Sequence, residues 1–418
     1  MVDPTRCCAA PLALRYHGHQ FGVYNPRLGD GRGFLHAQLL DPEDGRLLDL
    51  GTKGSGETPW SRGGDGRLTL QGGVREVLAA EMLEALSVPT AKALSLFETG
   101  EDLYRSDEAS PARSAVLVRL AHSHLRFGTF QRYAYLGDQD RLAKLFDFAV
   151  AHYHPDTRRA SRAETVLAFL GEVARRAGEL AAAYLVAGFV HGVLNTDNLN
   201  ITGESFDYGP YRFVPRYDPE FVAAYFDETG LYAFGRQPRA ILWAVGRFAE
   251  ALSPLCPETA LAPAVAEFRA AFSGARERRL LARLGVAPRG PDHDPVLVEA
   301  VFAFLEESVV PYDQFFFDLH GGLAREAKAL AGPAAERYQR PSYEALRGVL
   351  AGYRPARPER LEAAYFQGDA PCSLLIDEVR SIWDAIAARD DWSPFRAKVE
   401  AIRALGAALG VAPVATMG

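Results

Sequence analysis

Three residues in one short segment could hold a divalent cation and move a proton. The segment His-Gly-Val-Leu-Asn-Thr-Asp-Asn runs from His191 to Asn198 and contains Asp197, and Asp207 follows it in Asp-Tyr-Gly. Carboxylate and amide oxygens are ligands that Mg²⁺ and Mn²⁺ prefer, with waters and phosphates completing the coordination. We therefore expect Asn198 and Asp207 to bind a metal and Asp197 to act as a general base. The alternative is an Asn/Asp-rich turn that only caps the backbone.

The order of these residues resembles the catalytic loop and metal-binding turn of protein kinases, with one change. Kinases carry H-x-D-x-x-x-x-N followed by D-F-G, in which the first aspartate is the base and the Asn and second Asp bind Mg²⁺. Here Val193 stands at the position of the base and can accept no proton. The sequence therefore predicts a kinase-like site that carries out something other than ordinary phosphorylation.

Segments that precede this loop offer the groups that a nucleotide site needs. Backbone N–H groups can approach phosphates closely in glycine-rich turns, and Gly29, Gly31 and Arg32 lie in such a turn. Lys53 follows at the end of an expected strand. Glu76 lies on the next helix, on an apolar stripe where a carboxylate needs a cation partner. We predict that Lys53 and Glu76 pair beside the phosphates; an exposed lysine and a solvated glutamate are the alternative.

Additional positive charge comes from two later arginines and from a second glycine-rich loop. The loop at residues 58–67 contains Asp65 and Gly66, and ordinary kinases have no such loop at this place. Arg119 and Arg126 are seven residues apart. The forked guanidinium group suits phosphate oxygens. Salt bridges on the protein surface are the alternative for both arginines.

The elements expected to position these residues begin with a β-rich region. Residues 16–69 are glycine-rich and predict short strands joined by tight turns. Apolar residues at helical spacing predict a helix over residues 70–86. Residues 93–106 and 114–121 predict a pair of strands around a turn at Gly100-Glu101-Asp102.

The rest of the chain is expected to be mainly helical. After His124 the apolar pattern is helical, and Ser161 with Glu164 forms a capping box that opens a long helix. We therefore predict an α+β, protein-kinase-like fold of two lobes. The β-rich N-terminal lobe spans residues 1–130 and binds the nucleotide, and the helical C-terminal lobe spans residues 131–418 and carries the catalytic loop.

Composition narrows the functional class. The 418 residues include 48% hydrophobic side chains, which is enough for a real core, and the formal net charge is −7. Binding to nucleic acid or to a membrane surface needs a basic face, which this balance does not favour. The four cysteines form neither a disulfide framework nor paired zinc-ligand spacing. We expect a cytoplasmic, monomeric protein with no nucleic-acid or membrane partner.

Long ordered motifs then identify a family. The stretches YHGHQFG, LGDGR, TKGSGETPWSRGGDGR, SHLRFGTFQ, HGVLNTDN, DYGP, YDPEF and YAFGRQP resemble the successive signatures of the selenoprotein O family, also called the YdiU family. The resemblance is strong over about residues 16–250 and fades beyond about residue 330. It implies a kinase-like fold that binds ATP in a flipped orientation. It also implies transfer of AMP, or in some bacterial members UMP, to Ser, Thr or Tyr hydroxyls of protein substrates.

The resemblance also assigns roles by position. It implies that extra arginines draw the outer phosphates inward, so that pyrophosphate becomes the leaving group. Trp60 stands where the family has Tyr, which is a departure. A conventional kinase and an inactive ATP-binding scaffold are the competing functions. The implied ATP contacts are Gly29, Gly31, Arg32, Lys53, Asp65, Gly66, Arg119 and Arg126, with Glu76 as the partner of Lys53, Asp197 as proton acceptor, and Asn198 and Asp207 as ligands of Mg²⁺ or Mn²⁺.

Overall fold

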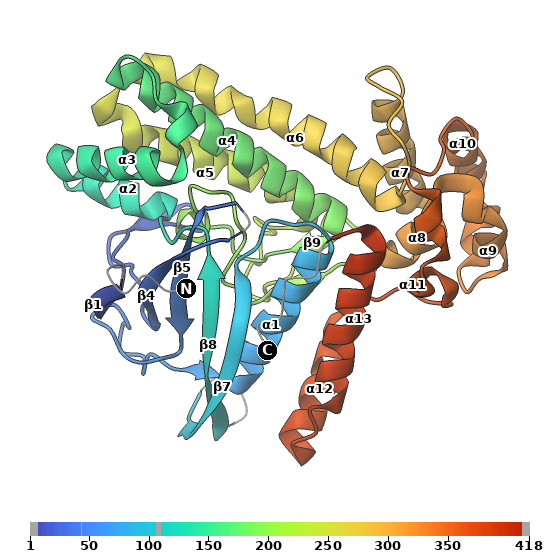
Figure 1. The fold of residues 1–418 in the computed structure, drawn as a ribbon, viewed down its shortest axis with the longest axis horizontal. Coiled ribbons are helices and arrows are strands. Elements are labelled where there is room, and N and C mark those ends of the chain that lie inside the picture. Colours follow the sequence, from blue (N-terminus) through green and yellow to red (C-terminus); the bar gives the residue numbers. More distant parts are fainter. Residues whose placement is uncertain (1–6, 43, 106–109, 412–418) are drawn as a thin grey trace.

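The protein combines an antiparallel sheet in its N-terminal part with a mainly helical remainder (Figure 1). The computed structural model describes residues 7–42, 44–105 and 110–411. This mixed α/β architecture agrees with the expected class. The expected division at residue 130 falls inside helix α2 (Phe127–Tyr135). Among the described residues, no helix is long and apolar enough to cross a membrane.

The sheet places two of the predicted cations on one face. Its strand order is β1-β4-β5-β8-β6, and β7 also pairs with β8. In β5, positions 49, 51 and 53 are more buried than their neighbours, as the two-residue period of a strand requires. Lys53 lies opposite Leu117, and Arg119 lies opposite Gly51, so both cations share the buried face. The strands are β1 (Cys7–Leu12), β4 (Gly33–Leu40), β5 (Leu47–Lys53), β6 (Leu68–Thr69), β7 (Lys92–Leu103) and β8 (Ala112–Ala121).

A second, smaller hairpin lies between β1 and β4 in the sequence. It consists of β2 (Gly18–Gln20) and β3 (Val23–Asn25), which pair in antiparallel fashion. Phe21 and Gly22 form the turn between them, and both have positive φ values, 50° and 80°. Such a turn matches the right-handed twist of the two strands.

The turn expected at Gly100-Glu101-Asp102 is wrong. Strand β7 continues through these residues to Leu103, and its register with β8 shifts between Glu98 and Asp102. Gly100 has a φ of 76°, which lets the strand absorb the irregularity without reversing direction. A glycine beside two acidic residues is typical of a turn, but here it marks a bulge.

Helix α1 (Leu70–Ala85) confirms the expected helix and carries Glu76. The side chain of Thr69 caps it by accepting a hydrogen bond from the N–H of Gly72 at 3.2 Å. Val74, Leu78 and Met82 are fully buried at the expected helical spacing. The C-terminal helix α13 (Ser393–Leu409) lies against α1, as Figure 1 shows, so the end of the chain supports the helix that positions Glu76.

The helical part is built around α4, the helix that the capping box predicted. Ser161 caps α4 and makes the reciprocal bonds with Glu164, and Gly188 ends the helix in a left-handed conformation. Helices α5 and α6 run beside α4 (Figure 1). The helices are α3 (Gln139–Tyr153), α4 (Arg162–Ala187), α5 (Gln237–Leu252), α6 (Leu261–Leu284), α7 (Asp294–Ser308), α8 (Tyr312–Asp318), α9 (Glu326–Ala331), α10 (Pro341–Leu350), α11 (Ala364–Gln367) and α12 (Ile376–Arg389).

A small two-stranded sheet closes the loop that carries the candidate catalytic residues. Strands β9 (Phe189–Val190) and β10 (Arg212–Phe213) pair in antiparallel fashion directly after α4. The chain between them includes a short 3-10 helix, η3 (Thr196–Asn198), and Asp207. Because the two ends of this loop are joined by the strands, Asp197 and Asp207 are held on the same side of the helical part, facing the sheet.

Candidate active site

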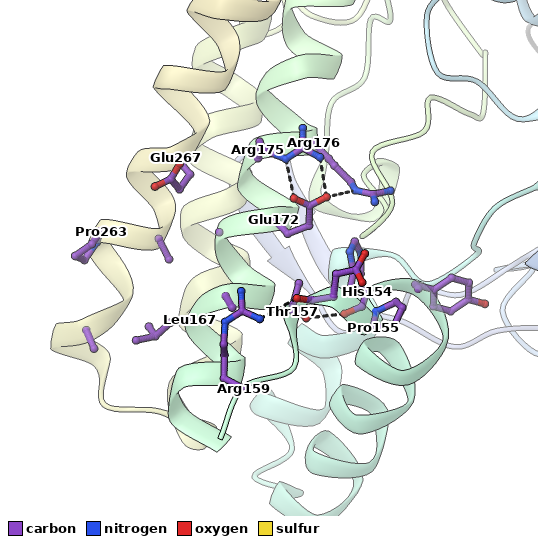
Figure 2. Close-up of a pocket in the computed structure, with 16 residues that line it drawn as sticks. His154, Pro155, Thr157, Arg159, Leu167, Glu172, Arg175, Arg176, Pro263 and Glu267 are labelled. Atoms are coloured by element: carbon purple, nitrogen blue, oxygen red, sulfur yellow. Dashed lines mark hydrogen bonds and ion pairs between the residues drawn. The ribbon is translucent and has the colours of Figure 1, made fainter. Parts of the chain in front are cut away.

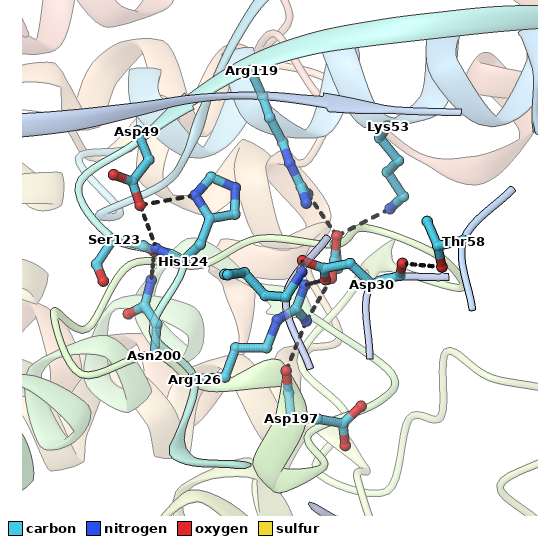
Figure 3. A network of polar contacts seen from close by, with 12 residues as sticks. Asp30, Asp49, Lys53, Thr58, Arg119, Ser123, His124, Arg126, Asp197 and Asn200 are labelled. Carbon is cyan, nitrogen blue, oxygen red and sulfur yellow. Dashed lines mark hydrogen bonds and ion pairs between the residues drawn. The ribbon is translucent and has the colours of Figure 1, made fainter. Parts of the chain in front are cut away.

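Asp207 accepts hydrogen bonds from three cationic side chains, those of Lys53, Arg119 and Arg126, which approach one another in Figure 3. Lys53 Nζ lies 3.1 Å and Arg119 Nη1 2.6 Å from Asp207 Oδ1, and Arg126 Nη1 lies 2.9 Å from Asp207 Oδ2. All three cations are buried, with side chains less than a tenth exposed. A buried cation needs a counter-charge, so Asp207 compensates a strongly positive centre.

The cations determine the ionisation of Asp207. Burial alone would raise its pKa, but Lys53, Arg119 and Arg126 outweigh burial and hold the pKa of Asp207 well below its usual range. Asp207 also has a φ of 60°, a left-handed conformation that aspartate tolerates better than most residues. The carboxylate is therefore charged and its direction is imposed by the loop.

The predicted ion pair between Lys53 and Glu76 is present. Lys53 Nζ donates to Glu76 Oε1, and both side chains are 7% exposed. Glu76 is more buried than we expected, because its place on the apolar stripe of α1 indicated a half-buried carboxylate. Lys53 therefore bridges Glu76 on α1 and Asp207 on the loop, which connects the sheet to the helical part through one ammonium group.

We expect Lys53 and Glu76 to be energetically coupled. Lys53→Met and Glu76→Gln should each lower kcat/KM, and the double variant should be less impaired than the sum, by about 0.5–3 kcal/mol of coupling. The measurement is a double-mutant cycle on nucleotidyl transfer. The partly exposed pair Lys92–Glu84, 2.7 Å apart and also anchored on α1, is the matched control with coupling of about 0–1 kcal/mol. Strict additivity of Lys53 and Glu76 would contradict the pairing.

Arg126 joins the sheet side of the site to the candidate base. Its Nη1 also donates to the backbone oxygen of Asp197 at 2.8 Å, and its Nη2 donates to Asp30 Oδ1 at 3.1 Å. The guanidinium lies over the rings of Tyr16 and Phe206, 4.6 and 4.7 Å from their centroids. These contacts place Asp197 and Asp207 within reach of a single guanidinium group.

Asp197 is a buried carboxylate with an unused oxygen. Its Oδ1 is buried and has no hydrogen-bond partner among the described residues. Burial raises the pKa of Asp197 to about 6, against the opposing effect of Arg126. A buried acceptor without a partner is costly, which is expected where a ligand supplies the missing donor or cation.

The oxygen atoms in this site fit Mg²⁺ or Mn²⁺. Asn198 Nδ2 donates to the backbone oxygen of Val193 at 2.9 Å, which leaves Asn198 Oδ1 as an acceptor. Such hard oxygens are ligands for these cations. In the part of the chain that the structure describes, no cluster of three or more His, Cys, Asp or Glu could hold a metal. A cation bound here would therefore take its other ligands from phosphates and water.

The β2–β3 hairpin covers residues 195–198, the segment that carries the candidate residues Asp197 and Asn198. We did not predict this contact. The N–H of His19 donates to Thr196 Oγ1 at 2.7 Å, and Thr196 Oγ1 donates to Gln131 Oε1 at 2.7 Å. A Cβ on Gly18 would lie 3.0 Å from Asp197 Oδ1, which is a tight contact, so glycine favours this close approach of the hairpin. The only signal in the sequence was the YHGHQFG motif itself.

Comparison with known proteins identifies the family. The family described as "Protein adenylyltransferase SelO" matches residues 5–403. The chain belongs to the SelO family. The match to residue 403 also shows that the expected loss of resemblance beyond about residue 330 is wrong.

Curated relatives in the SelO family are similar along most of their length. The "Protein nucleotidyltransferase YdiU" of Gloeobacter violaceus is 45% identical over 393 residues, which cover 92% of this chain and 80% of the relative. The protein of the same name from Synechocystis sp. is 42% identical over 408 residues, covering 94% of this chain and 84% of the relative. Membership places this chain among the transferases, in the nucleotidyltransferase class.

The glycines of LGDGR have a structural reason in this SelO protein. A Cβ on Gly29 would lie 2.5 Å from Trp60 Cγ, and one on Gly31 would lie 3.0 Å from the backbone oxygen of Trp60. Thr58 Oγ1 donates to the backbone oxygen of Asp30 at 2.8 Å, which ties the two loops together. The loop reaches the centre through Asp30 and Arg126, so a role of Gly29 and Gly31 in binding phosphate stays a prediction.

Three other residues that we predicted to contact ATP, Arg32, Asp65 and Gly66, form no hydrogen bond or ion pair with Asp207 within the described ranges 7–42, 44–105 and 110–411. Arg32 is exposed. Asp65 accepts two hydrogen bonds from Arg105, at 2.7 and 2.9 Å, which lowers the pKa of Asp65. Gly66 packs against the backbone of Gly56, where a Cβ would lie 2.1 Å from the oxygen. Their contribution to nucleotide binding stays a prediction as well.

A cavity of about 570 Å³ lies elsewhere, between the end of α3 and helices α4 and α6 (Figure 2). None of the predicted site residues lines it. Two of its cations are already paired, because Arg175 and Arg176 both donate to Glu172. Arg176 also donates to the backbone oxygen of Thr202 at 3.4 Å, and Thr202 follows Asp197 closely in the chain. The residues around Asp207 are the stronger candidate site, because three cations converge on its carboxylate and the neighbouring Asp197 has an unpartnered oxygen.

Proposed function

We propose that this protein transfers AMP from ATP to serine, threonine or tyrosine hydroxyls of proteins, releases pyrophosphate, and uses Mg²⁺ or Mn²⁺. One arrangement carries the proposal. Lys53, Arg119 and Arg126 converge on Asp207, Arg126 also contacts the backbone of Asp197, whose Oδ1 has no partner, and Val193 occupies the position of a kinase base. Family membership supports the same reaction.

The three cations suit a triphosphate. In the structure they share the charge of Asp207, and Arg126 also pairs with Asp30. Phosphate oxygens are stronger partners for guanidinium forks than a shared carboxylate, so ATP would compete for these donors. Two buried arginines in addition to the lysine favour holding the β- and γ-phosphates inward, which leaves the α-phosphorus toward Asp197.

Asp197 is the proposed general base. Its carboxylate would accept the proton of the substrate hydroxyl while the hydroxyl oxygen forms a bond to the α-phosphorus. The bond from the α-phosphorus to the bridging oxygen breaks, and pyrophosphate leaves with the electron pair. Mg²⁺ or Mn²⁺, held by Asn198 and Asp207, would supply charge neutralisation to the phosphates. The arginines stabilise the departing pyrophosphate by the same electrostatic principle.

We also propose a kinase-like arrangement of two lobes that meet near residue 130. The N-terminal sheet with α1 and its Lys53–Glu76 pair, followed by a helical part that carries Asp197, Asn198 and Asp207, supports it. A cytoplasmic location and a monomeric state stay predictions. So does the absence of nucleic-acid partners.

The deciding experiment identifies the transferred group. The protein is incubated with ATP labelled at either the α- or the γ-phosphate, and intact mass is measured in parallel. AMP adds about 329 Da to a modified protein and phosphate adds about 80 Da, because the increment is the mass of the group transferred. We expect α-label and the larger increment, and α-labelled UTP compares the two nucleotides directly. Label from the γ-position alone would establish a kinase, and binding without label would establish a scaffold.

A further inference from the structure

Three exposed aromatic rings form a continuous patch, which we call the aromatic patch: Phe21, Tyr225 and Phe226. Their exposed fractions are 39%, 86% and 46%. The ring of Phe226 lies 6.0 Å from that of Phe21 and 5.1 Å from that of Tyr225. Single exposed apolar residues are common on proteins, but contiguous ones mark sites of interaction. The patch joins the β2–β3 hairpin to a loop about 200 residues later in the chain.

The aromatic patch contacts residues 195–198, the segment that carries the proposed base. The N–H of Phe21 donates to Asn195 Oδ1 at 3.1 Å, and the hydroxyl of the buried Tyr232 donates to the same oxygen at 2.6 Å. The rings of Phe21 and Tyr232 lie 5.1 Å apart. Asn195 is two residues before Asp197. One side chain therefore couples the position of the patch to the position of the proposed base.

Burial of its ring does not explain why a phenylalanine occupies position 21, because the backbone conformation there is unfavourable for this residue type. Its φ of 50° is a conformation that asparagine and glycine adopt more readily than phenylalanine. The ring is partly exposed, so packing recovers only part of the conformational cost. A strained residue that is held in place beside an active site is grounds for a functional hypothesis.

We propose that the aromatic patch binds a segment of the protein substrate that carries an aromatic or large aliphatic side chain two or three residues from the modified hydroxyl. The inference rests on the proposed function. The spacing follows from the hairpin, because Gly18 lies against Asp197 and Phe21 is three residues further along. Three extended residues span about 10 Å, so an extended peptide with its hydroxyl at Asp197 reaches the patch over the same number of residues.

A second copy of this chain is the other occupant to consider. A stable dimer that buried the aromatic patch would cover the approach to Asp197, because both rest on the same segment of residues 195–197. Substrates must reach Asp197 during every reaction. The position of the patch therefore favours a transient partner that enters together with its hydroxyl group.

The test uses synthetic peptides with one central Ser or Tyr and randomised flanks, incubated with α-labelled ATP. The wild-type protein should select Phe, Tyr, Leu, Ile or Met two or three residues from the acceptor. The double variant Tyr225→Ser/Phe226→Ser should lose this selection and raise the KM for a Phe-flanked peptide about tenfold or more, with the KM for ATP within about twofold. Phe21→Asn should behave alike, since asparagine suits the positive φ and keeps the hairpin.

The matched control is Phe97→Ser on β7, which removes a ring that is 59% exposed outside the aromatic patch. It should preserve the selection. Equal labelling of all peptides by the wild type, or unchanged selection in the variants, would overturn the docking inference while leaving AMP transfer established. Absence of α-label on every peptide and protein would overturn the proposed function as well. A wild-type dimer that the double variant converts to a monomer, by light scattering, would assign the patch to a second copy.

Discussion

Replacing Asp207 with alanine is expected to abolish nucleotidyl transfer and also to destabilise the nucleotide-free protein. Loss of a ligand for a catalytic metal removes several kcal/mol of transition-state stabilisation, so transfer should fall by more than about a thousandfold. In the same variant Arg119 would lose its carboxylate partner, whereas Lys53 would keep Glu76 and Arg126 would keep Asp30. Leaving buried charges uncompensated costs about 3–5 kcal/mol.

Two measurements separate these effects. Thermal unfolding without nucleotide should show a lower Tm for Asp207→Ala than for the wild type. Calorimetric titration with pyrophosphate in the absence of metal should show binding at least as tight as in the wild type, because the carboxylate of Asp207 no longer competes for the three cations. Asp207→Asn keeps the shape and removes only the charge, so it serves as the control for packing. Transfer above about a tenth of the wild-type rate at saturating Mg²⁺ would rule out the assigned role.

Replacing Asp197 with asparagine is the second large effect, and it should leave stability intact. Loss of a general base lowers kcat/KM about 10²- to 10⁴-fold. The carboxylate is buried, its Oδ1 has no partner, and burial raises its pKa, so the folded protein gains little from this charge. An uncharged isostere in that place should therefore keep or slightly raise the Tm. Residues that serve the reaction at the expense of stability behave in this way.

The matched control for Asp197 is Asp294, which is buried to a similar degree. Asp294 accepts hydrogen bonds from the N–H groups of Arg289 and Gly290, both at 2.9 Å, and from the hydroxyl of Tyr353. Asp294→Asn should lower the Tm and keep transfer, the reverse of Asp197→Asn. Steady-state kinetics measures transfer by both variants, and calorimetry measures their Tm. If Asp197→Asn kept most of its activity, another group would have to be the base.

Several elements could be predicted because their determinants lie close together in the chain. The capping box of Ser161 and Glu164 acts over three residues, and the buried stripe of α1 repeats every turn. The Lys53–Glu76 pair was also predictable, since a carboxylate on a buried helix face needs a cation and the preceding strand ended in one. The turn expected at Gly100 failed because a glycine with positive φ serves a bulge as well as a turn.

Part of the candidate site depends on tertiary contacts that no local pattern contains. The sequence predicted that Asn198 and Asp207 bind a metal. Only the structure showed that three buried cations share Asp207. Trp60, which seemed only a departure from the family pattern, proved to pack against Gly29 and Gly31. Arg105 proved to be the partner of Asp65.

The sequence by itself indicated helix α1, the start of α4, a strand-rich N-terminal region, the residue types suited to metal and phosphate, and the family. Capping, periodicity and residue chemistry act within a few neighbours, so the order of residues contains them. The tertiary structure alone decided that Lys53 reaches Asp207, that the β2–β3 hairpin covers Asp197, and that Phe21 meets Phe226. The partners in these contacts lie more than 150 residues apart, and only the packing of the sheet against the helices brings them together.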